Sequence, residues 1–244
     1  MTLHAVPPPA SPIFRVARGD DAPPVDPFLP PSWERADADG TFGSRFDDPG
    51  KADGVPEEER FRVIYAATQR DGAFAETIAH FRPDLAALAA LAAIRDGAGE
   101  PHPLSGVVPA RWRQVRGVGR LLLDPALRFV DVAHPDTLAE MRTHLASLAV
   151  DRGHRDVDLS TITSGDRRLT QRVARYVHEQ TDDAGRPLFA GLRYVSRHGA
   201  SWECRALFAG RLVGDNLPVQ PVRADDAGLV AAAGHLGLTI QPDR

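Results

Sequence analysis

The clearest pattern of apolar and polar positions lies between residues 61 and 81. β-forming residues on a period of two lead up to Tyr65, which predicts a strand. Residues 69–72 are polar and end in glycine, which predicts a turn. Helix-forming residues follow, with Asp71 as the expected N-cap. Glu76 then falls near the start of the helix, where the helix dipole favours the ionised carboxylate. The short turn can therefore hold the Tyr65 ring and the Glu76 carboxylate over one pocket.

Elsewhere the same criteria predict further elements. Helices are expected over residues 83–97, 136–150, 165–180 and 225–234, and strands over residues 13–17, 41–46, 121–123, 129–132, 192–196, 202–208 and 236–240. Residues 121–123 and 129–132 flank an Asp-Pro turn, which predicts a hairpin. Because helices and strands are mixed without a regular βαβ rhythm, the sequence favours an α+β fold.

Proline and glycine mark the segments outside these elements. Residues 1–12 are proline-rich and are expected to form a disordered or extended tail. Residues 18–40, 47–60 and 96–118 are expected to form long loops. We expect the remainder, residues 13–244, to form a single domain.

Composition excludes several classes of protein. A net charge of -4 gives no reason to expect binding of nucleic acid. Cys204 is the only cysteine, and no His-Cys or His-Asp group has the spacing of metal ligands, so neither a disulfide nor a metal site is expected. No signal peptide is visible, and the longest apolar run, residues 85–94, is too short to span a bilayer. A cytoplasmic protein is therefore expected.

Two arginines are candidates for binding an anion. Arg15 lies in an otherwise apolar strand, where it needs an anionic partner or solvent. Arg45 lies between Gly43 and Phe46, and its guanidinium could bind a phosphate in a forked geometry. The alternatives are an edge-strand arginine in water or in a salt bridge for Arg15, and an ion pair with Asp47 or Asp48 for Arg45.

Three further residues are candidates for a site. Tyr65 can offer an aromatic face, but it can equally be a half-buried strand residue. Glu76 lies among apolar neighbours, so that burial near a pocket and simple surface exposure are both open. Ser196 follows a predicted strand, where a serine is more often structural than functional.

Taken together and in order, these residues resemble the RES domain family, which is named for its arginine, glutamate and serine. The matching segments are FRVAR with Arg15, GSRF with Arg45, VIYAAT with Tyr65, AFAETIAHF with Glu76, GLRYVSR with Ser196, and the late strand WECRALF. The resemblance covers residues 13–208, followed by the helix and edge strand predicted over residues 224–240. The glycine-arginine-tryptophan usual in the family is replaced here by Gly43-Ser44-Arg45-Phe46.

The resemblance implies a fold similar to ADP-ribosyltransferases, with split β-sheets around a cleft for NAD. Members of the family are bacterial toxins that deplete NAD by phosphorolysis or hydrolysis, and their usual partner is an antitoxin of the Xre type. Cleavage of the nicotinamide–ribose bond places positive charge on the ribose, which a fixed carboxylate such as Glu76 can stabilise. Arg15 and Arg45 are then expected to bind the pyrophosphate, Tyr65 to stack on nicotinamide, and Ser196 to bind the ribose or the carboxamide.

Other functions stay open from the sequence. One is transfer of ADP-ribose to a macromolecule, which commonly uses an acidic residue two positions before the glutamate, where this chain has Phe74. Another is a non-catalytic interaction protein of the same fold. No cofactor is expected beyond NAD as substrate and inorganic phosphate as a co-substrate, and a homo-oligomer is compatible with the sequence.

Overall fold

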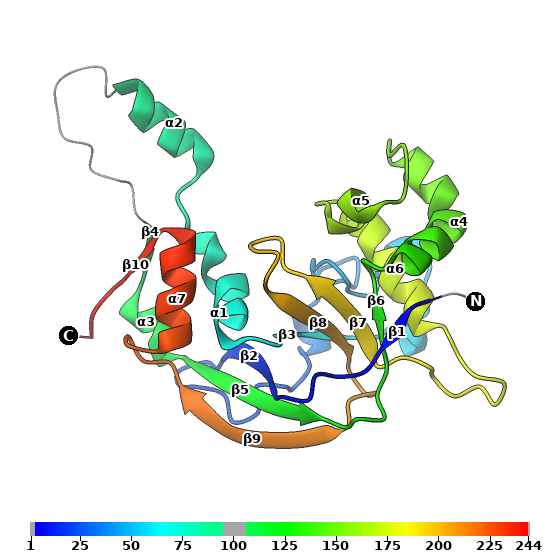
Figure 1. Cartoon of the computed structure of the whole chain (residues 1–244), viewed down its shortest axis with the longest axis horizontal. Helices are drawn as coiled ribbons and strands as arrows, with labels where there is room; N and C mark the ends of the chain where they lie inside the picture. The colour runs from blue at the N-terminus through cyan, green and yellow to red at the C-terminus, as the bar shows by residue number, and fades with distance from the viewer. Residues whose placement is uncertain (1–2, 95–105, 244) are drawn as a thin grey trace.

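A curled sheet of eight strands forms the centre of the computed structural model, which describes residues 3–94 and 106–243 (Figure 1). In spatial order the strands are β1 (Ala5–Val6), β6 (Phe129–Asp131), β7 (Gly191–Val195), β8 (Glu203–Phe208), β3 (Val63–Ala67), β2 (Ile13–Arg18), β5 (Arg116–Leu123) and β9 (Gly214–Pro221). All neighbours are antiparallel except β6 and β7. A small parallel sheet pairs β4 (Gly106–Val108) with β10 (Leu238–Ile240).

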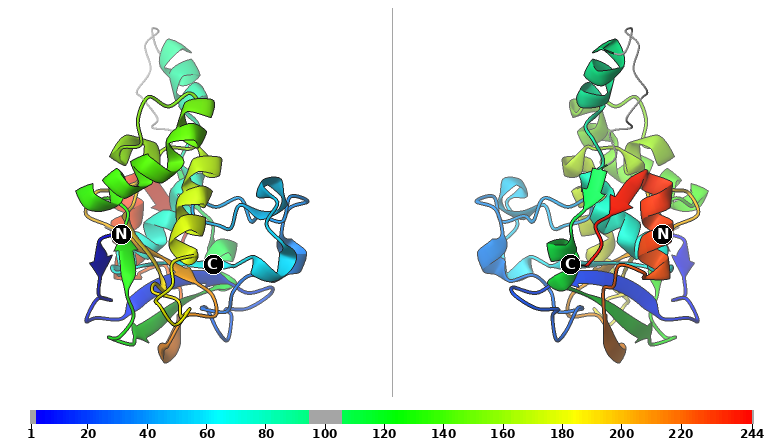
Figure 2. Two further views of the ribbon diagram at one scale, coloured as in Figure 1. Left: turned by 90° about the vertical axis from the view of Figure 1, so that its right-hand side faces the viewer. Right: turned by 90° about the vertical axis from the view of Figure 1, so that its left-hand side faces the viewer.

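Helices lie at both ends of the large sheet. They are α1 (Arg70–Ile78), α2 (Leu85–Ile94), α3 (Ala110–Gln114), α4 (Pro135–Asp151), α5 (Leu159–Thr163), α6 (Arg167–His178) and α7 (Ala227–Leu236). Helices α1 and α7 pack together near β2, whereas α4, α5 and α6 gather beside β6 and β7 (Figures 1 and 2). This mixed arrangement agrees with the predicted α+β class.

The sheet is almost divided between β2 and β3. These strands share a single paired position, Phe14 with Ala67, whereas β2 is paired along its whole length with β5. Beyond that position Arg15 and Val16 of β2 have no partner in β3, although Tyr65 of β3 is still paired with β8. The fold therefore opens a gap in the middle of the sheet, and the side chains around this gap form the candidate site.

Several sequence-based expectations differ from the structure. Residues 121–123 and 129–132 do not form a hairpin, because β5 pairs with β2 and β9 while β6 pairs with β1 and β7. Residues 41–46 form turns and bends instead of a strand. Residues 5–6 of the expected disordered tail form β1, which is paired with β6. For β1, β5 and β6, strand pairing between segments distant in sequence decided the outcome.

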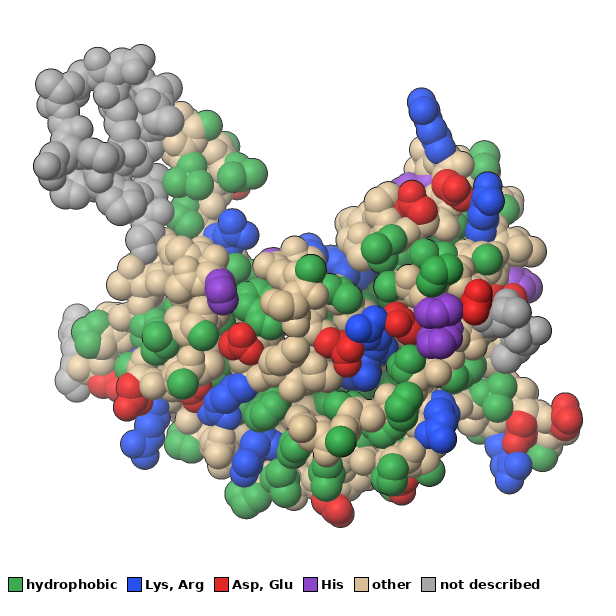
Figure 3. Space-filling model, viewed as in Figure 1, with side chains coloured by type: hydrophobic (Ala, Val, Ile, Leu, Met, Phe, Trp, Pro, Cys, Tyr) green, Lys and Arg blue, Asp and Glu red, His purple; other side chains and the backbone are tan. Residues whose placement is uncertain are grey.

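Helix α2 differs from the other helices in its surroundings. It stands off the rest of the described chain (Figures 1 and 2), and Leu85 is 80% exposed and Leu88 37% exposed. The expected apolar face of this segment is thus not packed into the core at these positions. Figure 3 shows the surface hollowed between the α2 side and the α4–α5 side, with acidic and basic side chains interspersed over this face. Within the described ranges, no helix has both the length and the apolar character needed to cross a bilayer.

Candidate active site

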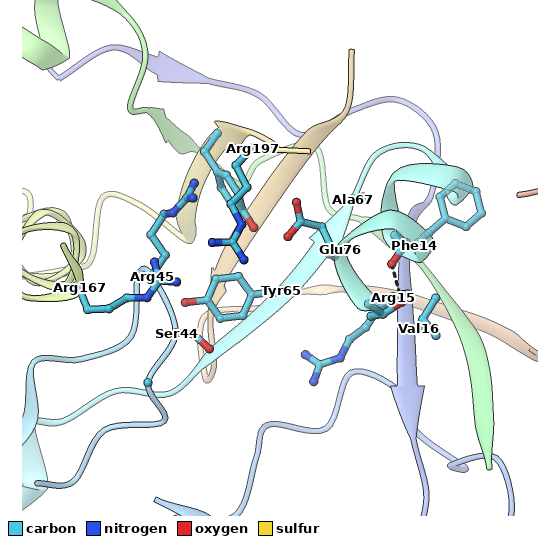
Figure 4. Close-up of a pocket in the computed structure, with 15 residues that line it drawn as sticks. Phe14, Arg15, Val16, Ser44, Arg45, Tyr65, Ala67, Glu76, Arg167 and Arg197 are labelled. Carbon is cyan, nitrogen blue, oxygen red and sulfur yellow. Dashed lines mark hydrogen bonds between the residues drawn. The ribbon is translucent and has the colours of Figure 1, made fainter. Parts of the chain in front are cut away.

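A cavity of about 350 Å³ lies where β2 and β3 separate. Its walls come from β2, β3, α1, the segment 43–45, the first residue of α6, and the residues at and after the end of β7. Arg15, Arg45, Tyr65 and Glu76 all line it (Figure 4). Ser196 does not line the cavity, but its hydroxyl forms a hydrogen bond to Glu76. Five residues from distant parts of the chain are therefore brought to one place.

Glu76 is held by a helix whose other faces are buried. It is the seventh residue of α1, and Phe74, Ala75 and Ile78 around it are fully buried. The side chain of Glu76 is left to face the cavity (Figure 4). Because Glu76 lies beyond the first turn of α1, the helix dipole stabilises its ionised form less than the sequence suggested. The N-cap is Gln69, and the predicted cap Asp71 instead accepts a hydrogen bond from Trp202 Nε1 at 2.9 Å.

Ser196 orients the Glu76 carboxylate. Its Oγ donates to Glu76 Oε1 at 2.5 Å and accepts from the backbone N–H of His198 at 3.0 Å. Ser196 is 5% exposed, whereas the Glu76 carboxylate that it bonds is exposed to the cavity. A charge-assisted bond of this kind fixes the carboxylate rotamer. Ser196 thus contacts the carboxylate, and it is not among the residues that line the cavity.

Tyr65 is tied to the segment that carries Arg45. Its hydroxyl donates to Asp47 Oδ1 at 3.0 Å and accepts from the backbone N–H of Phe46 at 2.9 Å. Burial raises the pKa of the Tyr65 hydroxyl well above its ordinary value, so the group stays protonated. With the hydroxyl engaged, what Tyr65 presents to the cavity is its ring (Figure 4).

Four arginines line the cavity, and none forms an ion pair with a carboxylate in the described part of the chain. They are Arg15, Arg45, Arg167 and Arg197. The alternative in which Arg45 forms an ion pair with Asp47 or Asp48 is therefore wrong, since Asp47 bonds Tyr65 and Asp48 lies beside Arg175. Burial lowers the pKa of the Arg15 guanidinium to about 10, and it also lowers the pKa of Arg45. Both guanidinium groups remain charged at neutral pH.

Two of these arginines have buried nitrogens without a partner. Nη1 of Arg15 and Nη1 of Arg167 are buried and bond to no atom of the described chain. Since an unpaired buried donor costs about 1–3 kcal/mol, such groups call for a ligand or ordered water. The guanidinium carbon of Arg45 lies over the rings of Phe46 and Tyr194, 5.9 Å from the centre of each ring. The cavity wall thus carries four arginines together with the Glu76 carboxylate, with Arg45 and Arg167 on one side of the Tyr65 ring and Glu76 and Arg15 on the other (Figure 4).

The comparison with protein-family models gives the family directly. The model of the RES domain matches residues 13–226 of the 244-residue chain. This protein belongs to the RES domain family. The match begins at the first residue of β2 and extends past the predicted limit of residue 208 through β9, so that it includes every residue lining the cavity. No curated protein matched the chain. The family is associated with enzymes that act on NAD.

Some cavity residues of this RES domain were missed by sequence reasoning. Arg197 directly follows Ser196, and Tyr194 lies in the same strand motif. Arg167 and Arg168 are the first two residues of helix α6, where the helix dipole disfavours cations. This unfavourable position was the one feature of the sequence that could have marked Arg167 as a candidate site residue. Its meaning emerges only because α6 packs against β7 and brings Arg167 to the cavity.

Away from the cavity, three side chains lie close enough together to hold a metal ion. His4, His134 and Asp136 are the one such set among the described residues, and none of them lines the cavity. The two imidazole rings stack with centroids 3.6 Å apart, and His134 Nδ1 accepts from the backbone N–H of Asp136 at 3.3 Å. These contacts join β1 to the start of α4 and give the group a structural role.

Proposed function

We propose that this RES domain cleaves the bond between nicotinamide and ribose in NAD. The observation that supports the proposal best is the placement of the Glu76 carboxylate across the cavity from Arg45 and Arg167, with the Tyr65 ring between them and Arg15 on the Glu76 side (Figure 4). NAD combines a pyrophosphate, an aromatic cation and a ribose on which positive charge develops during cleavage. Each of these parts has a counterpart of suitable chemistry in the cavity wall.

Glu76 acts on the ribose. As the C1–N bond breaks, its electron pair leaves with nicotinamide and positive charge spreads over the ribose ring. The carboxylate, held by Ser196, lies ready to stabilise that charge without reorganising. Nicotinamide departs as a neutral molecule, so no general acid is required.

Arg15 and Arg45 are proposed to bind the pyrophosphate, and Tyr65 to stack on the nicotinamide ring. The near division of the sheet at β2 and β3 supports an arrangement like that of ADP-ribosyltransferases, with NAD in the gap. Ser196 is reassigned: its hydroxyl is committed to Glu76, which favours an indirect role through the carboxylate over direct contact with the ribose.

Inorganic phosphate is the acceptor that the cavity favours. Arg167 and Arg197 are cationic groups beyond the two assigned to the pyrophosphate, and Nη1 of Arg167 is buried and unpartnered. A phosphate oxygen would attack C1 as nicotinamide leaves, giving ADP-ribose 1-phosphate. Attack by water would give ADP-ribose instead.

Transfer of ADP-ribose to a macromolecule is less well supported. Phe74, two positions before Glu76, is fully buried in the core, so no acidic group can act there on an acceptor. The non-catalytic alternative is disfavoured by the open cavity, which the lining side chains do not fill. We further propose that the protein is a cytoplasmic toxin restrained by an Xre-type antitoxin, and membership of the RES family supports the toxin-like part of this proposal.

Incubation of the purified protein with NAD, with and without phosphate, tests the proposal. Nicotinamide release should be measured by chromatography and the sugar product by mass spectrometry. We expect phosphate-dependent release and a phosphorylated product, both lost in Glu76→Gln. Release independent of phosphate would assign water as the acceptor, and intact NAD would refute cleavage.

A further inference from the structure

Asp47 is a buried carboxylate beside the cavity that the proposed chemistry does not use. It is 3% exposed, and burial raises the pKa of its carboxyl group. It forms no ion pair with any arginine of the described chain and is not among the residues that line the cavity. Burying a carboxylate without a neighbouring cation costs free energy, so the hydrogen bonds that Asp47 accepts must hold it in place.

The two oxygens of Asp47 hold two different elements. Oδ2 accepts from the backbone N–H of Ser44 at 2.6 Å, and Oδ1 accepts from the Tyr65 hydroxyl at 3.0 Å. The Tyr65 hydroxyl accepts in turn from the N–H of Phe46 at 2.9 Å. The backbone on both sides of Arg45 is therefore bonded, directly or through Asp47, to one side chain of β3.

This bonding matters because the segment has no other regular support. Residues 43–47 contain turns and bends and belong to no helix or strand. Gly43 adopts a positive φ of 71°, which turns the chain into the segment. Without a ladder of backbone bonds, the position of Arg45 depends on side-chain contacts, and those to Tyr65 and Asp47 flank it directly.

We infer that Asp47 is a positioning residue for Arg45, acting by fastening the segment 43–47 to Tyr65. The inference rests on the proposed function for the part that concerns NAD. It also gives Tyr65 a second role, since its hydroxyl anchors the segment while its ring faces the cavity. A carboxylate is needed at residue 47 because both of its oxygens accept, whereas an amide would set an N–H₂ group against a donor.

Asp47→Asn is the decisive variant, and Asp48→Asn is its matched control. Asp48 is the next residue and equally buried at 2%, but it accepts from the N–H of Gly50 at 2.8 Å and lies beside Arg175, away from the cavity. Both substitutions remove one buried charge and are expected to lower the melting temperature. Only Asp47→Asn should raise the KM for NAD, by roughly tenfold to a hundredfold, as expected for a lost charge-assisted contact at Arg45.

A double-mutant cycle separates positioning from general damage. If Asp47 acts through Arg45, its substitution should change the KM little in an Arg45→Lys background. Amide hydrogen exchange gives a second measurement that needs no ligand. The N–H of Ser44 should exchange at least tenfold faster in Asp47→Asn, and that of Phe46 in Tyr65→Phe, with both unchanged in Asp48→Asn.

The outcomes are distinguishable. An unchanged KM and unchanged exchange in Asp47→Asn, or equal changes in Asp48→Asn, would overturn the inference. If the wild-type protein releases no nicotinamide, the proposed function fails, and the exchange rates still decide whether Asp47 fastens the segment. Faster exchange at Ser44 with an unchanged KM would show that the segment does not position Arg45 for NAD.

Discussion

The hydroxyl of Ser196 donates a hydrogen bond to the Glu76 carboxylate at 2.5 Å, although 120 positions separate the two residues in the sequence. Glu76 lies on α1 and Ser196 directly follows β7, so the bond joins a helix to the end of a strand of the large sheet. It fixes the one carboxylate that faces the arginine-rich side of the cavity.

Glu76→Gln should abolish most nicotinamide release while leaving the fold intact. The amide keeps the size of the side chain but removes the charge that opposes the ribose cation. Loss of one such electrostatic contact costs on the order of 10²–10³ in kcat. The melting temperature should change little, because Glu76 is exposed to the cavity and not packed in the core. Near wild-type turnover would exclude Glu76 from the chemistry.

Ser196→Ala should slow turnover less than Glu76→Gln. A hydrogen bond to a charged group contributes about 1.5–3 kcal/mol, which corresponds to roughly a tenfold to hundredfold loss in kcat. The KM for NAD should change less than kcat, since Ser196 does not line the cavity. Steady-state kinetics of this variant and of Ser201→Ala, which changes an exposed serine in the same loop between β7 and β8, provide the comparison. A change confined to KM would indicate direct contact with NAD.

Arg15→Lys and Arg45→Lys should each lower kcat/KM by roughly tenfold to a hundredfold, because lysine cannot bind two phosphate oxygens in a fork. Arg70 would be a natural control from its place in the sequence, but it is paired with Asp226 and bonded to Gln220. Arg111 is the better control, because its side chain is 69% exposed and its ion pair is with Asp21, which is itself exposed, so that it contributes little. Equal activity of all three lysine variants in a nicotinamide-release assay would remove the arginines from the site.

His178 should make the fold sensitive to acid. Its ring stacks on Phe61 with centroids 4.2 Å apart, and burial, followed by the charges of Arg211 and Arg175, lowers its pKa to about 3. Because an unfolded histidine has a pKa of about 6.5, the unfolded chain binds the extra proton first. Stability is therefore full above pH 6.5 and declines as the pH falls toward 3, by at most about 1.4 kcal/mol per pH unit from this group.

The His178→Phe variant tests this dependence. It retains the ring stacking but cannot bind a proton, so its melting temperature should fall less than that of the wild type between pH 7 and pH 5. His235→Phe, at an exposed position, should behave as the wild type does. The same decline in all three proteins would assign the acid sensitivity to other groups.

Sequence alone determined the parts of this protein that depend on local chemistry. The periodicity of residues 61–81 predicted β3 and α1, and apolar spacing predicted α4, α6 and α7 close to their observed limits. The motifs around Tyr65, Glu76 and Ser196 indicated the RES family, which the family model confirms. These features are encoded in neighbouring residues, whose propensities act without reference to the rest of the chain.

Tertiary structure decided what depends on pairing between distant segments. The sequence could not show that β2 and β3 share only one paired position, yet this near separation creates the cavity. The sequence also could not show that Arg167 reaches the site, or that Asp47 bonds Tyr65 and not Arg45. Strand order and buried hydrogen bonds arise from the packing of the whole chain. Because a buried polar group without a partner costs free energy, packing decides which partner each group takes.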